Sequence, residues 1–143
     1  MIACAQRYAF DPARVVAVGF SNGANIAAAL RLLRPEVLAG AVLLRPMVPF
    51  VPEKLPALAG RRVLVATGKS DPIVPAAQSE ALAELLHRAG ADLALHWSPG
   101  GHGLERADLA AGRCVAAGGS AQVTGPGRCA IKRPRPCARS STG

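Results

Sequence analysis

The sequence contains one short motif that could position a nucleophile. Residues 19–23 have the form G-x-S-x-G, with Ser21 between Gly19 and Gly23. A buried strand is predicted before this motif and a helix after it, and in that context the glycines permit a turn too tight for side chains. Such a turn exposes the serine hydroxyl above a sheet, at the N-terminus of the helix. A chance glycine-rich turn is the alternative, but the context favours a nucleophile.

Two further residues could assist this serine. An unassisted serine hydroxyl is a poor nucleophile and needs a base, which an acid in turn orients. In α/β enzymes with this motif the chain order is Ser, then Asp or Glu, then His. Asp71 and His102 follow in that order, each just after a predicted strand. Because α/β sheets place their sites at the carboxyl ends of strands, we predict Ser21, Asp71 and His102 as the catalytic residues.

Simpler interpretations exist for these and other polar residues. Asp71 could be an ordinary acid at a helix N-terminus, since two prolines follow it, and His102 could be a loop histidine. His87 lies within a predicted helix near its charged face, where a solvated histidine is expected. His96 lies inside a predicted strand, which favours a structural role. Asp92, at a junction of helix and strand, is most simply a turn acid.

The segments that must position these residues alternate between strand and helix patterns. Short apolar runs of the kind that parallel sheets bury on both faces occur at 15–18, 41–44, 63–67 and 93–97. Helices are predicted over 21–33, 75–90 and 104–111, and residues 1–9 resemble the end of another. The helix over 21–33 is apolar nearly all round and should be buried. This alternation predicts an α/β fold of about four parallel strands with flanking helices.

The charge is distributed unevenly along the 143 residues, whose net charge is +8. Residues 1–111 contain 11 basic and 9 acidic side chains, whereas residues 112–143 contain 6 basic and none acidic. The second segment is rich in Gly and Pro without a sustained period, so we expect a disordered basic C-terminal tail. Its charges could bind phosphates nonspecifically, but it has no aromatic residue and no recognised motif, which argues against nucleic-acid binding.

Cysteine spacing and hydropathy exclude other classes. The longest run without a charged residue spans 16 residues, 15–30, whereas a membrane helix needs roughly 20 apolar residues. The cysteines have no C-x-x-C spacing and no nearby histidine, so we expect neither a zinc site nor a disulfide framework, and a cytoplasmic location is the default. They are Cys4, Cys114, Cys129 and Cys137.

Residues from about 8 to 110 resemble the phospholipase/carboxylesterase family of the α/β-hydrolase superfamily. The matching segments are 11–24, Arg45-Pro46-Met47, 68–75 and 99–103. The resemblance implies hydrolysis of a small carboxylic ester, with thioesters and phospholipid esters among the family's substrates. It also implies an acyl-enzyme with Ser21 as nucleophile, His102 as base and Asp71 as orienting acid, and neither a metal nor a cofactor.

The same resemblance suggests where the oxyanion and the acyl group would lie. The backbone N–H of Asn22, the residue after the nucleophile, is one expected oxyanion donor. The loop over 45–58 contains four prolines and follows the second strand, where it is expected to overhang the site. Residues that could line an acyl pocket, or merely pack, are Phe20, Met47, Val48, Phe50 and Val51.

The N-terminal part of the sequence departs from the family pattern. Only 20 residues precede Ser21, and they lack the His-Gly pair that in the family marks the source of a second oxyanion N–H. Losing one such donor costs roughly 100- to 1000-fold in rate. Because so few residues precede it, the strand over 15–19 should also lack a neighbouring strand on one side. It would then be an exposed edge, through which self-association is expected.

The C-terminal part of the sequence also departs from the family pattern. We predict that the helix after His102 breaks at Gly112, and that residues 112–143 are read out of frame or are unrelated added sequence. The sequence thus predicts a partial α/β-hydrolase fold, with a truncated hydrolase domain over 1–111 and a tail over 112–143. Three functions follow as hypotheses: a serine esterase, an inactive hydrolase fragment, and a nucleic-acid binder acting through the tail.

Overall fold

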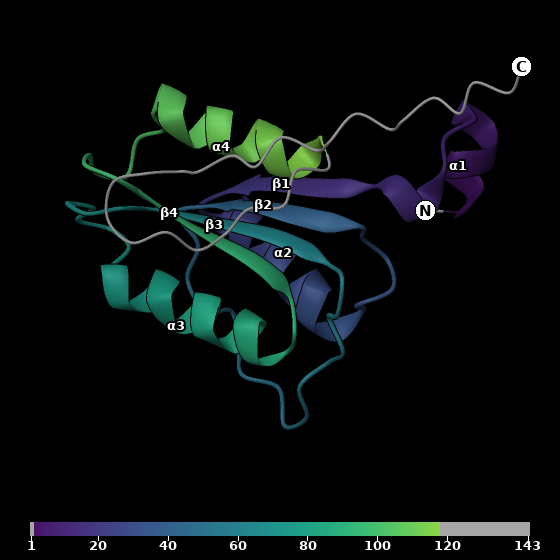
Figure 1. Ribbon diagram of the computed structural model, residues 1–143, viewed down its shortest axis with the longest axis horizontal. Coiled ribbons are helices and arrows are strands. Elements are labelled where there is room, and N and C mark those ends of the chain that lie inside the picture. The colour runs from purple at the N-terminus through teal and green to yellow at the C-terminus, as the bar shows by residue number, and fades with distance from the viewer. Residues whose placement is uncertain (1, 118–143) are drawn as a thin grey trace, which may run out of the picture.

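The computed structural model describes residues 2–117 of the chain, and these form a four-stranded parallel sheet between helices (Figure 1). The strands β1 (Val16–Phe20), β2 (Gly40–Leu44), β3 (Arg62–Gly68) and β4 (Asp92–Ser98) are neighbours in that order. The helices are α1 (Ile2–Tyr8), α2 (Asn22–Leu33), α3 (Ala76–Arg88) and α4 (Arg106–Ala116), with a 3-10 turn at Pro12–Arg14. The predicted α/β class with four parallel strands is confirmed.

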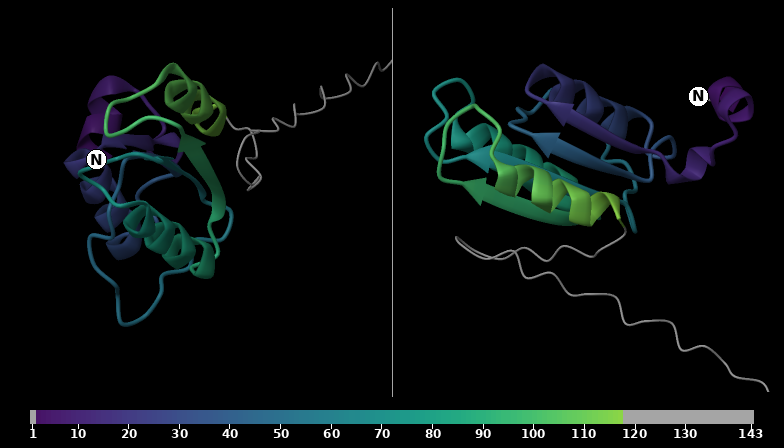
Figure 2. Two further views of the ribbon diagram at one scale, coloured as in Figure 1. Left: turned by 90° about the vertical axis from the view of Figure 1, so that its left-hand side faces the viewer. Right: turned by 90° about the horizontal axis from the view of Figure 1, so that it is seen from above.

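The helices form two layers, with α2 and α3 on one face of the sheet and α4 on the other (Figures 1 and 2). Alternate strand residues face these two layers, as the pleat of a strand requires. Leu43 and Val65 belong to the core on the side of α2 and α3, whereas Val42 and Leu64 belong to the core beneath α4. Burial on both faces explains why the central strands are continuous apolar runs.

The ends of α3 follow the predicted signals. Pro75 immediately precedes the helix, and Gly90, just beyond its last turn, has a φ of 89°, a left-handed conformation that glycine adopts without strain. Leu82, Leu85 and Leu86 are buried against the sheet. The helix therefore begins and ends close to the predicted bounds, and its amphipathic stripe packs as expected.

The predicted break at Gly112 is wrong, because α4 continues through this residue to Ala116. A Cβ at Gly112 would lie 3.0 Å from Cγ1 of Val42, so the glycine allows close packing of the helix on the sheet. Ala111 and Val115 are buried beside it and continue the apolar stripe. This burial offsets the roughly 1 kcal/mol that glycine costs within a helix. The predicted disorder of the tail is therefore wrong for residues 112–116, which lie in this helix. The predictions for residues 118–143 fall outside the described residues.

The strand predicted to be an edge, β1, does lie at the edge of the sheet, but it is less buried than its apolar run predicts. β1 pairs only with β2 among the described strands, and its Val18 is 68% exposed. The prediction that α2 is buried all round is also wrong, since Ile26 and Leu33 are both exposed. The two differences have separate causes within residues 2–117. The sheet covers only one side of α2, and α4 packs on β2, β3 and β4, so Val18 of β1 faces the groove beside that helix and is left uncovered. No helix in this range is long and apolar enough to cross a membrane.

Candidate active site

The carboxyl ends of the four strands bring the candidate residues to one edge of the sheet. Ser21 follows β1, Arg45 follows β2, Asp71 lies in the loop after β3, and His102 lies in the loop after β4. The strands are parallel and in register, with Phe20, Leu44, Ala66 and His96 aligned across the sheet. Loops that are far apart in sequence therefore meet at this edge, as in other α/β proteins.

The backbone at Ser21 is in the left-handed region, with a φ of 51°. A residue with a side chain pays about 1–3 kcal/mol for such a conformation, which persists only where its surroundings enforce it. The N–H of Ser21 donates to the carbonyl of Leu44 at 2.8 Å, and its own carbonyl accepts from the N–H groups of Ala24 and Asn25. These bonds hold the sharp turn between β1 and α2 and direct the serine hydroxyl outward.

Only one of the two glycines in the motif is required by close packing. A Cβ at Gly19 would lie 2.4 Å from the carbonyl oxygen of Gly23, too close for any side chain. A Cβ at Gly23 would meet nothing within 4 Å. The prediction that both glycines flank a turn too tight for side chains is therefore correct for Gly19 and wrong for Gly23.

This difference gives a matched pair of variants. We expect Gly19→Ala to lower the free energy of unfolding by about 2 kcal/mol, because an added methyl would force β1 away from the first turn of α2. Gly23→Ala should be neutral or slightly stabilising, by up to about 1 kcal/mol, since alanine favours a helix. Urea denaturation measures both values, and equal effects at the two positions would contradict the packing described here.

Three side chains from separate loops form a chain of hydrogen bonds. Nε2 of His102 lies 3.1 Å from Oγ of Ser21, and its Nδ1 lies 2.8 Å from Oδ2 of Asp71. The His102 ring also packs against Phe20, with ring centroids 5.1 Å apart. The structure thus brings the predicted residues Ser21, Asp71 and His102 together, and it places Phe20 beside them.

Asp71 uses its two oxygens for different purposes. Oδ1 accepts from the backbone N–H groups of Ile73 and Val74, which is the local role of an ordinary turn acid, while Oδ2 faces His102. Burial raises the pKa of this carboxyl, but hydrogen bonds from Val74, His102 and Ile73 outweigh it, and the pKa of Asp71 lies below its usual value. Because an ionised carboxylate can only accept, the tautomer of a neutral His102 ring that fits this contact has its proton on Nδ1, which leaves the Nε2 lone pair for the serine hydroxyl.

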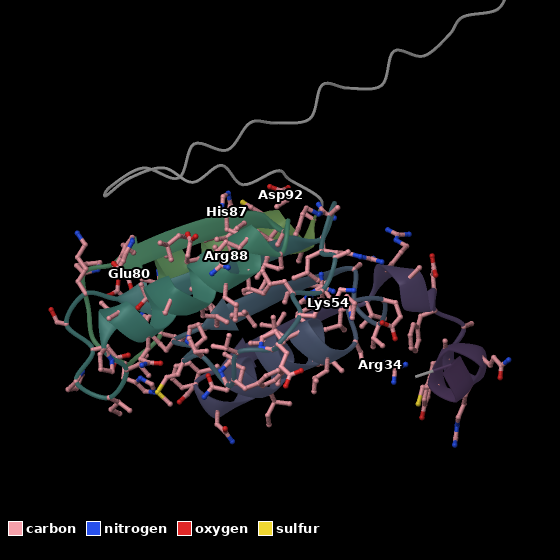
Figure 3. The ribbon with its side chains drawn as sticks, turned by 90° about the horizontal axis from the view of Figure 1, so that it is seen from below. Arg34, Lys54, Glu80, His87, Arg88 and Asp92 are labelled. Carbon is pink, nitrogen blue, oxygen red and sulfur yellow. The ribbon has the colours of Figure 1, made fainter. Side chains whose placement is uncertain are left out.

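The remaining polar residues lie away from this hydrogen-bonded chain. His87 is exposed on the outer face of α3, next to Arg88 (Figure 3), as predicted. Asp92 begins β4 and is exposed. Nε2 of His96 lies 3.5 Å from Oδ1 of Asp108 on α4.

The residues predicted to bind the oxyanion and the acyl group differ in burial and in their hydrogen-bond partners. Asn22 is the first residue of α2, so its N–H has no carbonyl within the helix to bind. The N–H of Met47 donates to Oδ1 of Asn25 at 2.8 Å. Val48 and Phe50 are partly buried and pack against the core beneath α2 and α3, whereas Val51 is exposed.

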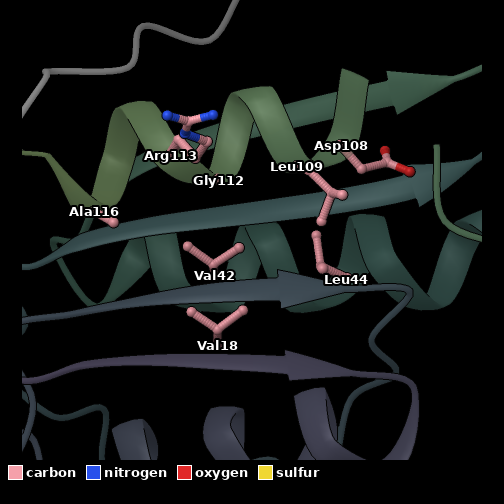
Figure 4. Close-up of a pocket in the computed structure, with 8 residues that line it drawn as sticks. All are labelled: Val18, Val42, Leu44, Asp108, Leu109, Gly112, Arg113 and Ala116. Atoms are coloured by element: carbon pink, nitrogen blue, oxygen red, sulfur yellow. The ribbon is translucent and has the colours of Figure 1, made fainter. Parts of the chain in front are cut away.

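An apolar groove of about 340 Å³ lies on the other face of the sheet, between β1 and α4 (Figure 4). Its lining residues are Val18, Val42, Leu44, Asp108, Leu109, Gly112, Arg113 and Ala116. None of the residues predicted for the acyl pocket lines this groove. The described residues contain no group of three His, Cys, Asp or Glu side chains that could hold a metal ion.

Sequence reasoning missed the role of Arg45 and Asp108. Both side chains are fully buried and form an ion pair at 2.9 Å behind the His102 loop. The only signal in the sequence was Arg45 itself, a charged residue directly after a buried apolar run. Its partner Asp108 lies 63 residues further on, so the pairing depends on tertiary structure.

Comparisons with known proteins agree with the fold. Residues 2–117 match a family described as the dienelactone hydrolase family. MhqD of Bacillus subtilis (strain 168), named as a hydrolase, is 45% identical over 100 residues, covering 70% of this chain and 50% of MhqD. Among solved structures, a Bacillus cereus carboxylesterase has a TM-score of 0.77 and 41% identity, over 81% of this chain and 55% of the other.

A carboxylesterase from Mesorhizobium loti is also similar, with a TM-score of 0.71 and 36% identity over 82% of this chain and 56% of the other. The chain thus spans about half the length of the relatives that it matches. The family match over residues 2–117 includes β1 to β4 and the loops that follow them, and the agreement supports a partial α/β-hydrolase fold.

Proposed function

Because the chain belongs to the dienelactone hydrolase family, we propose that it hydrolyses carboxylic esters as a serine hydrolase of the carboxylesterase kind. The observation that carries the proposal is the hydrogen-bonded chain from Ser21 Oγ through the His102 ring to the Asp71 carboxylate. A dienelactone is a cyclic ester, and two similar solved proteins are named as carboxylesterases. These names favour an ester carbonyl as the group attacked.

The proposed reaction transfers an acyl group in two steps. Nε2 of His102 accepts the proton of the Ser21 hydroxyl as Oγ attacks the ester carbonyl, and it then gives that proton to the departing alcohol. A water molecule, deprotonated by the same nitrogen, attacks the acyl-enzyme and releases the acid and the free serine. Asp71 holds the ring in the required tautomer and stabilises its positive charge while it carries the extra proton.

The negative charge on the carbonyl oxygen requires hydrogen-bond donors. We propose the N–H of Asn22 as one of them, because it lies at the start of α2 with no partner within the helix. The positive end of the helix dipole favours an anion at the same place. Phe20, Met47, Val48 and Phe50 remain candidates for the acyl pocket, Phe20 through its contact with His102.

A substrate series tests this function and its range. We expect Ser21-dependent hydrolysis of p-nitrophenyl acetate, and comparison with longer acyl esters, an acyl thioester and a phospholipid identifies the substrate class. Activity on a phospholipid or thioester would extend the proposed substrate range beyond simple carboxylic esters. Folded protein that hydrolyses none of these would contradict the proposal and favour an inactive hydrolase fragment.

We propose that the chain is located in the cytoplasm and that the proposed reaction needs no cofactor.

We also propose that the chain self-associates through β1. Its Val18 is 68% exposed, and the strand has a free edge within the described residues. A lysine on such an edge opposes pairing with another strand, so Val18→Lys should shift the concentration dependence of the apparent mass toward the monomer. Light scattering measures this shift. Val51→Lys, at a loop valine that is 72% exposed, is the matched control and should leave the mass unchanged.

A further inference from the structure

We propose that Arg45 is a positioning residue that holds the His102 loop, residues 100–103, in the geometry needed for proton transfer. The proposal rests on the function proposed above, since it concerns the residue assigned there as the base. Arg45 directly follows β2, and its φ of 55° is in the left-handed region. Its side chain is fully buried, and its backbone N–H donates to the carbonyl of Ala66 at 2.7 Å.

The Arg45 guanidinium binds the backbone on both sides of His102. Its Nε donates to the carbonyl of Gly101 at 3.0 Å, and its Nη2 donates to the carbonyl of Gly103 at 2.9 Å. These are the residues immediately before and after the histidine. A loop with three glycines has many accessible conformations, so two charge-assisted hydrogen bonds to it restrict the loop considerably.

Asp108 and Glu105 support the same loop together with Arg45. We call these three residues, Arg45, Asp108 and Glu105, the Arg45 clamp. Both oxygens of Asp108 accept from the guanidinium, at 3.3 and 2.9 Å, and Oδ2 also accepts from the N–H of Glu105. Oε1 of Glu105 accepts from the N–H of Gly100, the first residue of the loop. The clamp therefore holds the loop at its start and on both sides of His102.

Stability alone does not account for this pair. The Arg45 and Asp108 side chains are fully buried, and the desolvation of two such charges largely offsets their attraction. Apolar residues of similar volume often stabilise a fold equally well. What the ion pair supplies is a fixed set of donors facing the loop, and a fixed loop keeps His102 Nε2 3.1 Å from Ser21 Oγ.

The size of the effect follows from this geometry. A displacement of about 1 Å between reacting groups can cost about 100-fold in rate. Because Arg45 bonds to the loop backbone, we expect its loss to lower kcat by about 100-fold and to leave KM within about threefold, as for an interaction made only in the transition state.

The test removes both buried charges together, so that neither is left unpaired. In Arg45→Met/Asp108→Asn, the asparagine keeps an oxygen for the Glu105 N–H. The full chain is assayed for ester hydrolysis, and amide hydrogen exchange is followed over residues 99–104. We expect native circular dichroism, a fall in kcat without a matching rise in KM, and faster exchange in the loop. Arg34→Met, which removes only the exposed pair with Glu36, is the control and should change neither.

A folded double variant with unchanged kcat and unchanged loop exchange would overturn the proposal, as would a rise in KM alone. If the double variant fails to fold, Arg45→Lys replaces it. Lysine keeps a charge opposite Asp108 but lacks the fork that reaches both carbonyls, so a fall of about tenfold in kcat supports the clamp and an unchanged kcat overturns it.

The two proposals fail in different ways. Wild-type protein without Ser21-dependent hydrolysis would refute the proposed function. In that case the clamp is still judged by hydrogen exchange, and faster exchange over 99–104 in the double variant supports it whereas unchanged exchange overturns it.

Discussion

Ser21→Ala should reduce ester hydrolysis almost to the spontaneous rate, because only the oxyanion donor and substrate binding remain. The variant keeps the turn between β1 and α2, because the bonds that hold it involve the backbone N–H and carbonyl of residue 21. It removes only the hydroxyl that faces His102 Nε2 at 3.1 Å. Loss of a catalytic serine typically costs on the order of 10⁶-fold in kcat. Initial rates of p-nitrophenolate release, corrected for spontaneous hydrolysis, measure the effect.

Ser70→Ala is the matched control for this loss. Ser70 is an exposed serine in the loop after β3, with its Oγ 3.5 Å from the carbonyl of Pro99. We expect its removal to change kcat by less than about twofold, since exposed substitutions of this kind usually alter stability by no more than 0.5 kcal/mol. Equal activity in Ser21→Ala and wild type would mean that hydrolysis does not depend on this serine.

Asp71→Asn should have the second largest effect, a fall in kcat of about 10⁴-fold. An amide keeps the size of the carboxylate and retains an oxygen for the N–H groups of Ile73 and Val74. Its NH₂ group, however, would face His102 Nδ1 and favour the tautomer with the proton on Nε2. In that tautomer His102 donates to the serine oxygen and no longer accepts its proton. Steady-state rates with the same ester measure the change.

A second aspartate in the chain provides a close control. Asp11 also precedes a proline, and its Oδ1 accepts from the N–H of Ala13 two residues on, as Oδ1 of Asp71 does from Ile73. It lacks a histidine partner. Asp11→Asn should leave kcat unchanged, so a similar loss in both variants would assign the effect of Asp71 to local turn structure and not to His102.

Much of the site could be predicted from local sequence. The G-x-S-x-G motif predicted a turn after a strand, and the structure contains Ser21 in a left-handed conformation at that turn. The order of Ser21, Asp71 and His102 predicted their proximity, because parallel strands end at one edge of a sheet. These inferences depend on short-range chemistry and on one topological rule. Their catalytic roles remain predictions that the variants above test.

Other features depend on tertiary contacts that local patterns do not reveal. Gly112 looked like a helix breaker, but its place against Val42 makes it compatible with α4. Val18 and Ile26 looked like core residues, since apolar runs indicate burial without showing whether a neighbouring element covers them. Arg45 pairs with Asp108 across 63 residues, and no local pattern connects the two.

Covalent labelling with a fluorophosphonate tests the central claim most directly, because the reagent requires a serine activated by its base. Folded wild-type protein, as judged by circular dichroism, should gain one adduct by intact mass, and peptide mapping should locate it at Ser21. Ser21→Ala should gain none, and Asp71→Asn should react far more slowly. Folded wild-type protein that stays unlabelled, or labelling that persists in Ser21→Ala, would contradict the assignment of Ser21 as an activated nucleophile.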